Sequence, residues 1–280
     1  MDSSDAIEAR KADGKAGRKG GTGETMRFLI ILFLLALALR SFIVAPFSIP
    51  SGSMLPKMMI GDYLFVAKWP YGFSRFSLPI ALDGWKGRIP EGAPERGDVV
   101  VFRYPGGGGD DYVKRVIGLP GDQIQVRDGA LWLNGEPVPR VRVADYRMRV
   151  SANSPCRMVV PEAARIERDG DGTLFCVYPQ YRETMPGGRS HQILDQARGP
   201  GDDTPVYLVP EGHYFVMGDN RDDSEDSRFA REIGGVGFLP SDYLIGEALI
   251  TFFSTDGSAE WLKPWTWFSA ARWDRIGMTY

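Results

Sequence analysis

A serine in a short proline-bounded segment and a lysine on a predicted strand are the residues that could act together as nucleophile and base. Ser53 lies within residues 49–56, IPSGSMLP, whose prolines restrict the backbone on both sides of it. Alternation along a strand places Lys114 on one face with Tyr112 and Val116. A lysine buried among such neighbours has a lowered pKa, so its neutral amine can accept a proton from a serine hydroxyl. A loop serine and a solvated surface lysine are the ordinary alternatives.

A dense polar segment, GDNRDDSEDSR at residues 218–228, follows the apolar run 214–217. Alternating acidic and amide side chains beside a glycine are compatible with a calcium loop. The segment lacks the Asp-x-Asp-x-Asp-Gly order with a terminal glutamate that such a loop has. Its arginines favour ion pairs within the segment, so we expect no metal site there.

Two other hydrolytic chemistries lack the motifs that they require. The histidines, His191 and His213, are 22 residues apart and no His-Glu-x-x-His occurs, which argues against a zinc protease. None of the eight lysines has a serine three residues before it, so the Ser-x-x-Lys motif of penicillin-binding enzymes is missing. We expect neither a metal nor another cofactor.

An apolar segment near the N-terminus is predicted to anchor these residues to a membrane. Residues 28–39 contain no polar side chain, and apolar character continues past Arg40, so about 20 residues are available to span a bilayer. A removed signal peptide would need small residues at alternate positions before the cut. Here Val44-Ala45 is followed by Pro46, and proline is a poor residue just after a scissile bond. The sequence therefore predicts an anchor at residues 28–47, behind a disordered tail at residues 1–27.

The distribution of basic residues predicts the orientation of this anchor. Only Lys57 is basic among the 27 residues that follow Arg40. The basic residues that precede the span are Arg10, Lys11, Lys15, Arg18, Lys19 and Arg27. By the positive-inside rule, we expect a single-pass protein of the cell (inner) membrane with a cytoplasmic N-terminus and a periplasmic, extracytoplasmic body.

Strand signals dominate the rest of the chain, which predicts a mainly β fold. Short β-branched or aromatic runs lie between Gly, Pro and Asp clusters at residues 63–67, 98–104, 112–117, 123–127, 130–133, 214–217 and 244–253. Asp128-Gly129 predicts a hairpin, and the glycines at 106–109 connect two runs that we expect to pair antiparallel.

The strand pattern weakens between about residues 140 and 209, which suggests an insertion. We expect an antiparallel β-sheet catalytic domain with an inserted β-rich subdomain, preceded by one N-terminal transmembrane helix. The expected divisions are 48–123 with 210–280 for the catalytic domain and 124–209 for the insert. C-terminal aromatic residues either contact the membrane interface or pack against the sheet: Trp261, Trp265, Trp267, Phe268 and Trp273.

The cysteine count and net charge bound the environment and the partners. Cys156 and Cys176 are the only cysteines, and in an exported domain they are either a disulfide or two free thiols. A net charge of -3, without a basic stripe, argues against nucleic acid as a partner.

Four motifs, in this order behind a membrane anchor, resemble the boxes of bacterial type I signal peptidases. They are SGSMLP at 51–56, GDYLFV at 61–66, RGDVVVF at 96–102 with YVKRVIGLPGD at 112–122, and GDNRDDSEDSR at 218–228. The resemblance extends from about Ile49 to Ala248. It implies a membrane-bound serine endopeptidase that removes signal peptides from exported preproteins after Ala-x-Ala sites. Its partners would be those signal peptides, membrane lipid and the protein export machinery.

Carried onto the matching positions, the resemblance implies a role for four catalytic residues. Ser53 would be the nucleophile and Lys114 its general base. Ser51 would donate its hydroxyl, together with the Ser53 backbone N–H, to the oxyanion. Ser224 would form a hydrogen bond with Lys114 and orient it.

The resemblance also implies supporting and substrate-binding residues. Asp226 and Arg228 would form an ion pair, within a segment whose other supporting residues are Asp219, Asn220 and Arg221. Shallow apolar pockets for the small residues of the cleavage site would be lined by Ile49, Pro50, Met54, Met58, Tyr112 and Val113. An extended substrate would lie alongside an enzyme strand.

Three positions depart from the family pattern. Lys57 stands where the family usually has threonine, which makes it a rival base near Ser53. Asp223 replaces a usual asparagine and Glu225 a small residue. The added negative charge beside Ser224 is expected to raise the pKa of the lysine.

Two further functions compete with this interpretation. A self-cleaving Ser–Lys repressor-type protease on a related β fold is cytoplasmic, so the anchor counts against it. A membrane-anchored β-rich assembly or adhesion module explains the topology but leaves the polar motifs without a role.

Overall fold

The structure is a computed structural model that describes residues 22–77, 84–85, 87–157, 165–260 and 262–280. Two compact units divide the chain at Leu39 and Arg40, so the helical segment and the body are described separately. The predicted tail at residues 1–27 lies outside the described residues up to position 21, and its last part is wrong, because residues 22–27 belong to the apolar helix.

Helix α2, Thr22–Phe42, is the apolar element near the N-terminus. Its residues Gly23–Phe42 have a mean hydropathy of 2.0, and the helix is long and apolar enough to cross a membrane. Most of its apolar side chains are exposed, and only 6% of the spanning window is buried. In water this exposure would be unfavourable, whereas in lipid it is stabilising.

The predicted anchor at 28–47 is wrong at its C-terminal boundary, because the helix ends at Phe42 and strand β1, Val44–Ser48, follows. Pro46 has no N–H to donate to a helix and biases the residue before it toward extended backbone. The strand pairs antiparallel with β2, Asp62–Ala67, and lies at the edge of its sheet. An edge position tolerates the missing donor of a proline.

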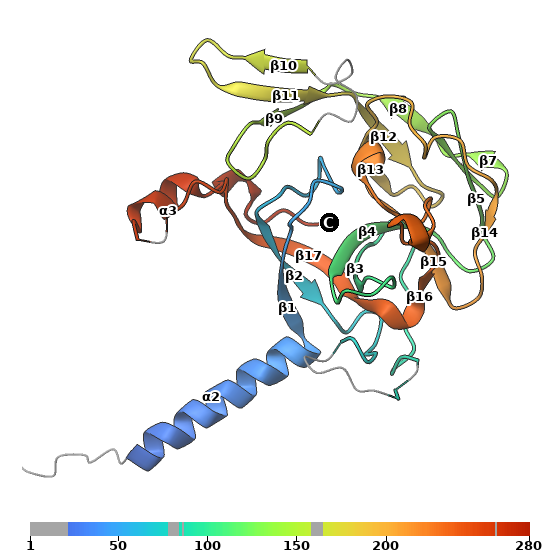
Figure 1. Ribbon diagram of the computed structural model, residues 1–280. Helices are drawn as coiled ribbons and strands as arrows, with labels where there is room; N and C mark the ends of the chain where they lie inside the picture. The colour runs from blue at the N-terminus through green and yellow to red at the C-terminus, as the bar shows by residue number, and fades with distance from the viewer. Residues whose placement is uncertain (1–21, 78–83, 86, 158–164, 261) are drawn as a thin grey trace, which may run out of the picture. The chain divides into compact units, whose positions relative to one another are not determined.

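A seven-stranded sheet forms the centre of the body (Figure 1), and all its neighbouring strands are antiparallel. The strand order is β1-β2-β17-β3-β4-β15-β16. The remaining bounds are β3 Val99–Arg103, β4 Asp111–Gly118, β15 His213–Met217, β16 Leu239–Pro240 and β17 Leu244–Ser254. The long β17 therefore lies between the N-terminal pair, β1 and β2, and the pair β3 and β4, of which β4 carries Lys114.

Three smaller sheets come from the middle of the chain. Their orders are β14-β5-β6-β7, β13-β12-β8 and β10-β11-β9. The bounds are β5 Gln123–Arg127, β6 Ala130–Leu133, β7 Glu136–Pro137, β8 Arg140–Arg142, β9 Tyr146–Arg149, β10 Arg165–Arg168, β11 Leu174–Tyr178, β12 Gln180–Thr184, β13 Ser190–Leu194 and β14 Tyr207–Leu208. The predicted mainly β, antiparallel fold class is confirmed, while the division at 124–209 stays a prediction.

Short helices complete the described chain. They are η2 Arg221–Asp223, η3 Arg231–Ile233, η4 Ser241–Tyr243, α3 Trp265–Ala270 and η5 Trp273–Arg275.

Two predicted strand pairings are confirmed. β3 and β4 pair antiparallel, with Val100 opposite Lys114. β5 and β6 form the hairpin predicted at Asp128-Gly129, where φ is 46° and 75°. Positive φ at both turn residues matches the right-handed twist of the flanking strands.

Apolar residues on both faces of the central sheet form its core. Alternate residues of β3 belong to different clusters: Val99 and Val101 to one, Val100 and Phe102 to the other. The second cluster also receives Tyr112 and Val116, the two neighbours predicted to share the face of Lys114. A lysine at this point of the sheet is consequently surrounded by apolar side chains.

Cys156 and Cys176 form a disulfide, with their Cα atoms 5.5 Å apart. The bond joins the segment after β9 to β11, and both cysteines pack in the apolar cluster that contains Leu55 and Met59.

We predict that replacing both cysteines by serine lowers the free energy of unfolding by about 3 kcal/mol, because the cross-link restricts the unfolded chain. Catalytic turnover should persist below the unfolding transition. Denaturant titration of oxidised wild type and the double variant measures the difference. Two free thiols in non-reducing mass analysis of protein isolated from the exported compartment would contradict the assignment.

Candidate active site

Ser53 and Lys114 meet although 61 residues separate them in the chain. Lys114 Nζ donates a hydrogen bond of 2.7 Å to Ser53 Oγ. β4 supplies the lysine, and the turn that follows β1 supplies the serine. The turn is closed by backbone bonds from Leu55 N to Gly52 O and from Met58 N to Met54 O. The predicted nucleophile–base pair is thus within hydrogen-bond distance.

Burial favours the neutral amine that a general base requires. Lys114 is 4% exposed, and the ring centroid of Tyr112 lies 5.5 Å from its Nζ. This burial lowers the pKa of Lys114 from 10.5 to about 8. Nearby carboxylates oppose the shift, in the order Asp226, Glu225, Asp219 and Asp223. Glu225 and Asp223 therefore raise the pKa of Lys114, as expected from the sequence.

The turn at residues 218–224 forms hydrogen bonds with the backbone of residues 49–56, the serine segment that carries Ser53. Asn220 donates its backbone N–H to Ser53 O at 3.0 Å and its side-chain Nδ2 to Gly52 O at 3.1 Å. Gly218 permits this approach, because a Cβ there would lie 2.6 Å from Ser53 O and 2.2 Å from Ser224 Oγ. Glycine at 218 and asparagine at 220 are therefore needed to seat the serine.

Ser51 lies beside the nucleophile on the same turn. Its hydroxyl oxygen is 3.3 Å from Ser53 Oγ, longer than a usual hydroxyl hydrogen bond, and its side chain is exposed. The Ser53 backbone N–H makes no hydrogen bond to any described residue. The Ser53 N–H is therefore available as a donor among the described residues, and the Ser51 hydroxyl is held by no more than the long contact to Ser53 Oγ.

The predicted hydrogen bond between Ser224 and Lys114 is absent. Ser224 Oγ is buried and has no hydrogen-bond partner among the described residues. Lys114 Nζ instead donates to Ser53. Ser224 does lie at this site, because its Oγ would contact a Cβ on Gly218. The sequence motif thus placed Ser224 near the catalytic pair correctly, but the predicted hydrogen bond to Lys114 does not form.

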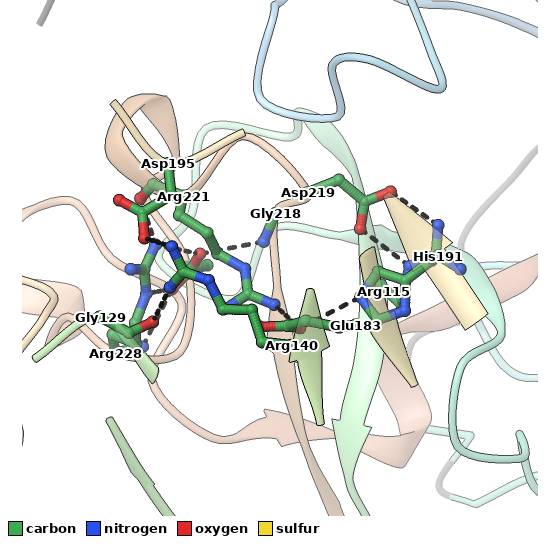
Figure 2. A network of polar contacts seen from close by, with 11 residues as sticks. Arg115, Gly129, Arg140, Glu183, His191, Asp195, Gly218, Asp219, Arg221 and Arg228 are labelled. Atoms are coloured by element: carbon green, nitrogen blue, oxygen red, sulfur yellow. Dashed lines mark hydrogen bonds and ion pairs between the residues drawn. The ribbon is translucent and has the colours of Figure 1, made fainter. Parts of the chain in front are cut away.

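Buried ion pairs stabilise the polar turn at residues 218–224 (Figure 2). Asp226 and Arg228 pair as predicted, with two contacts of 2.9 Å, and Asp226 also accepts from the Gly218 N–H at 3.0 Å. Asp219 accepts two bonds from Arg115, at 2.6 and 2.8 Å. Because these partners are nearly wholly buried, loss of one would leave an uncompensated charge.

Arg115 and Glu183 are supporting residues that the sequence analysis missed. Arg115 follows Lys114 in β4, and its position in the motif was the one available signal. Glu183, in β12, pairs with Arg221 of the turn. The coulombic field of that arginine helps to lower the pKa of Glu183 to about 2, against its burial. No local pattern in the sequence around Glu183 indicates this contact.

Four of the six predicted substrate-binding residues belong to one apolar cluster, Ile49, Met54, Met58 and Val113. Met54 and Met58 are 2% and 0% exposed, so they support the serine segment from inside. Pro50 is exposed, and Tyr112 packs against the neighbouring cluster. The structure thus brings part of the predicted set together.

One acidic group elsewhere in the described chain has the spacing to hold a cation. Carboxylate oxygens of Asp195, Asp202 and Asp222 lie within 4.8 Å of one another. Arg140 pairs with Asp195 at 2.5 Å, which supplies positive charge without a metal. Burial raises the pKa of Asp222 to about 6, so proton uptake also relieves the repulsion. The group carries no catalytic contact to Ser53.

Comparison with known proteins identifies the family. A family model described as signal peptidase, peptidase S26, matches residues 22–253. This chain belongs to the signal peptidase family, peptidase S26. The signal peptidase I of Rickettsia canadensis (strain McKiel) is 34% identical over 255 residues, which cover 87% of this chain and 84% of the relative. The signal peptidase I of Rickettsia typhi (strain ATCC VR-144 / Wilmington) is 37% identical, covering 79% and 76%.

A crystal structure of a signal peptidase I from Enterococcus faecalis V583 is 26% identical, covers 55% of this chain and 96% of that chain, and has a TM-score of 0.29. The family assignment rests on the sequence matches.

Membership of the signal peptidase family confirms the predicted class of serine peptidase that removes signal peptides. It excludes the alternative of a non-catalytic assembly or adhesion module. The apolar helix α2 agrees with a membrane-anchored signal peptidase.

Proposed function

We propose that this signal peptidase cleaves exported preproteins after small residues of the Ala-x-Ala type, with Ser53 as nucleophile and Lys114 as general base. The observation that supports the proposal most directly is the 2.7 Å hydrogen bond between a buried lysine and a serine on a clamped turn. Within the described chain, no other lysine forms a hydrogen bond with Ser53.

The chemistry follows from the positions of these two atoms. Neutral Lys114 removes the proton from Ser53 Oγ, which attacks the scissile carbonyl carbon and forms a C–O bond. The resulting lysinium gives its proton to the leaving amine as the peptide C–N bond breaks. Water, deprotonated by the same lysine, then hydrolyses the acyl-enzyme and restores the serine hydroxyl.

Two donors on the serine turn stabilise the oxyanion in this proposal. The Ser53 N–H has no partner among the residues that the structure describes, and the Ser51 hydroxyl lies 3.3 Å from Ser53 Oγ, so both donors are close to the carbon under attack. One such donor typically contributes roughly 3–4 kcal/mol to transition-state stabilisation. The role of Ser224 becomes indirect in this proposal. Its side chain packs against Gly218, whose lack of a Cβ lets the turn approach Ser53.

The substrate is proposed to lie as an extended strand beside the enzyme, with its small side chains over a surface at Val113 beneath which Ile49, Met54 and Met58 are buried. These methionine and branched side chains are packed in the core and leave little room for large groups. Pro50 and Tyr112 would lie on the rim of this surface. Small residues at the cleavage site would fit such shallow contacts.

We also propose that the helix crosses the inner membrane with its N-terminus in the cytoplasm, and that lipid and the export machinery are partners. The uneven distribution of basic residues supports this orientation. Exposed aromatic side chains of the body, Trp265, Phe268 and Trp273, support a contact with the lipid interface, and they argue against simple packing on the sheet. Trp261 lies outside the described residues.

We predict that protease added outside intact spheroplasts digests the body and leaves an N-terminal fragment that contains the protected first 25 or so residues together with the span, because this orientation exposes only residues after the span. Immunoblotting with an N-terminal tag measures the fragment. A body protected until detergent is added would contradict the orientation.

The proposed specificity is tested with a purified precursor that carries an Ala-x-Ala site, because the mass of the released product gives the cut position. Wild-type enzyme should cut after the second alanine. A precursor with leucine at that position is the matched control and should be cut at least tenfold more slowly, since a large side chain overpacks the shallow contact. Equal rates for the two precursors would contradict the proposed pocket.

A further inference from the structure

An ion pair joins the disulfide-bonded part of the chain to the polar turn beside the nucleophile, and the proposed reaction gives it no role. Arg157 Nε lies 2.6 Å from Asp223 Oδ2, and Arg157 Nη2 donates a hydrogen bond of 2.9 Å to Asp223 Oδ1. The guanidinium therefore meets both oxygens of the carboxylate, and such a contact fixes the orientation of the carboxylate as well as its distance.

This pair lies against the residue that precedes Ser53. A Cβ placed on Gly52 would be 3.4 Å from Arg157 Cδ and 3.5 Å from Asp223 Oδ2. The backbone of Asp223 also belongs to the turn that seats the serine, because its N–H donates to Asn220 O at 3.2 Å. Asn220 in turn donates to the carbonyl oxygen of Ser53. The ion pair consequently borders the backbone that carries the nucleophile.

The backbone of Arg157 is held by β11. Its N–H donates to the hydroxyl of Tyr178 at 3.0 Å, and the residue before it, Cys156, is bonded to Cys176 of the same strand. Burial raises the pKa of Tyr178, so this hydroxyl stays protonated and adds no charge near Asp223. The side chain of Arg157 is 46% exposed and that of Asp223 only 18%, so the carboxylate depends on the arginine more than on water.

The charges around Lys114 follow a common pattern. Four carboxylates oppose the effect of burial on this lysine, and three of them have an arginine partner. The three pairs are Asp226 with Arg228, Asp219 with Arg115, and Asp223 with Arg157. Glu225, the fourth, forms no ion pair within the described part of the chain. Figure 2 shows Arg228 and Arg115, which belong to the sequence motifs, whereas Arg157 lies outside them.

We propose that Arg157 is a positioning residue of the catalytic centre, which holds the carboxylate of Asp223 beside Gly52 and offsets its charge at Lys114. The inference rests on the proposed function, because this charge affects turnover only if Lys114 is the base. Among the described residues, Arg157 forms no hydrogen bond with Ser53 or Lys114, so it acts through Asp223. Without the arginine, the carboxylate would favour the protonated lysine more strongly, and less neutral amine would be present near neutral pH.

The test compares the pH profile of kcat/KM for wild type and Arg157→Gln on one Ala-x-Ala precursor. Arg157→Gln should lower kcat/KM about threefold at about pH 6, the size of a partly exposed ion pair. Above about pH 9.5 it should match wild type, because the lysine is then neutral in both enzymes. A merely structural role would lower this plateau as well.

Two further variants act as controls on the same profile. Arg157→Lys keeps the positive charge and should lie closer to wild type than Arg157→Gln. Arg165→Gln removes another exposed arginine, which pairs with Asp145 at 2.8 Å, and should leave the profile unchanged.

A double variant shows whether Arg157 acts through Asp223. Asp223→Asn should move the acidic limb to lower pH, since it removes a carboxylate that favours the protonated lysine. In that background, Arg157→Gln should lower kcat/KM at about pH 6 by no more than about 1.5-fold. The proposal is overturned if Arg157→Gln leaves the acidic limb in place, lowers the plateau as much as the limb, or has an unchanged effect in the Asp223→Asn enzyme. Those results leave the assignment of Ser53 and Lys114 intact, whereas near-normal turnover of Lys114→Arg would refute the proposed function.

Discussion

Replacing Lys114 by methionine is expected to lower kcat by roughly a thousandfold or more, because it removes the group that accepts the serine proton. The fold should persist. Lys114 is 4% exposed and has the ring of Tyr112 beside it, so an apolar, unbranched side chain of similar length suits the space. Turnover measured by product mass, with thermal unfolding of the same preparation, separates loss of the base from loss of structure.

Arginine at position 114 is the sharper control, because guanidinium keeps its charge and hydrogen-bonding capacity but cannot act as a base near neutral pH. Lys114→Arg is therefore expected to be as inactive as Lys114→Met. Near-normal turnover of Lys114→Arg would contradict the assignment. If Lys57→Met, and not Lys114→Met, abolished cleavage, Lys57 would be the base.

The same assignment fixes the direction of the pH dependence. Because burial lowers the pKa of Lys114 to about 8, kcat/KM should rise about tenfold per pH unit below 8 and level off above it. The carboxylate of Glu225 raises this pKa, so Glu225→Gln should move the acidic limb to lower pH.

Local sequence patterns predicted the central strands β2, β3, β4, β15 and β17, because alternation leaves a regular signal, but they did not predict β1 or β16. Alternation placed Lys114 on the face of Tyr112 and Val116, and the structure puts those two residues in one cluster. The pairing of Lys114 with Ser53 came from the resemblance, since residues 61 positions apart share no local pattern. Specific motifs supplied what periodicity could not.

The features that the sequence missed depend on contacts between distant segments. Glu183 pairs with Arg221 across 38 residues of the chain. Arg157 pairs with Asp223 across 66 residues. The end of the anchor was misplaced because apolar composition does not distinguish a helix from an edge strand. Pro46 held the decisive signal, as a residue that favours extended backbone before it.

Ser53→Ala is the second large effect, because the nucleophile forms the covalent bond of the proposed reaction. Loss of such a residue typically costs roughly 10⁴- to 10⁶-fold in turnover. Ser51→Ala removes only an oxyanion donor and should cost about 10²- to 10³-fold, which makes it the matched control on the same turn. The two hydroxyls are 3.3 Å apart, so the comparison also decides which of them attacks.

Cleavage of a purified precursor by wild type, Ser53→Ala and Ser51→Ala, read from the mass of the product, tests the central claim that Ser53 is the nucleophile. We expect full conversion by wild type, slow conversion by Ser51→Ala and no product from Ser53→Ala. A Ser53→Ala enzyme that released the same product at a rate near that of wild type would contradict the account.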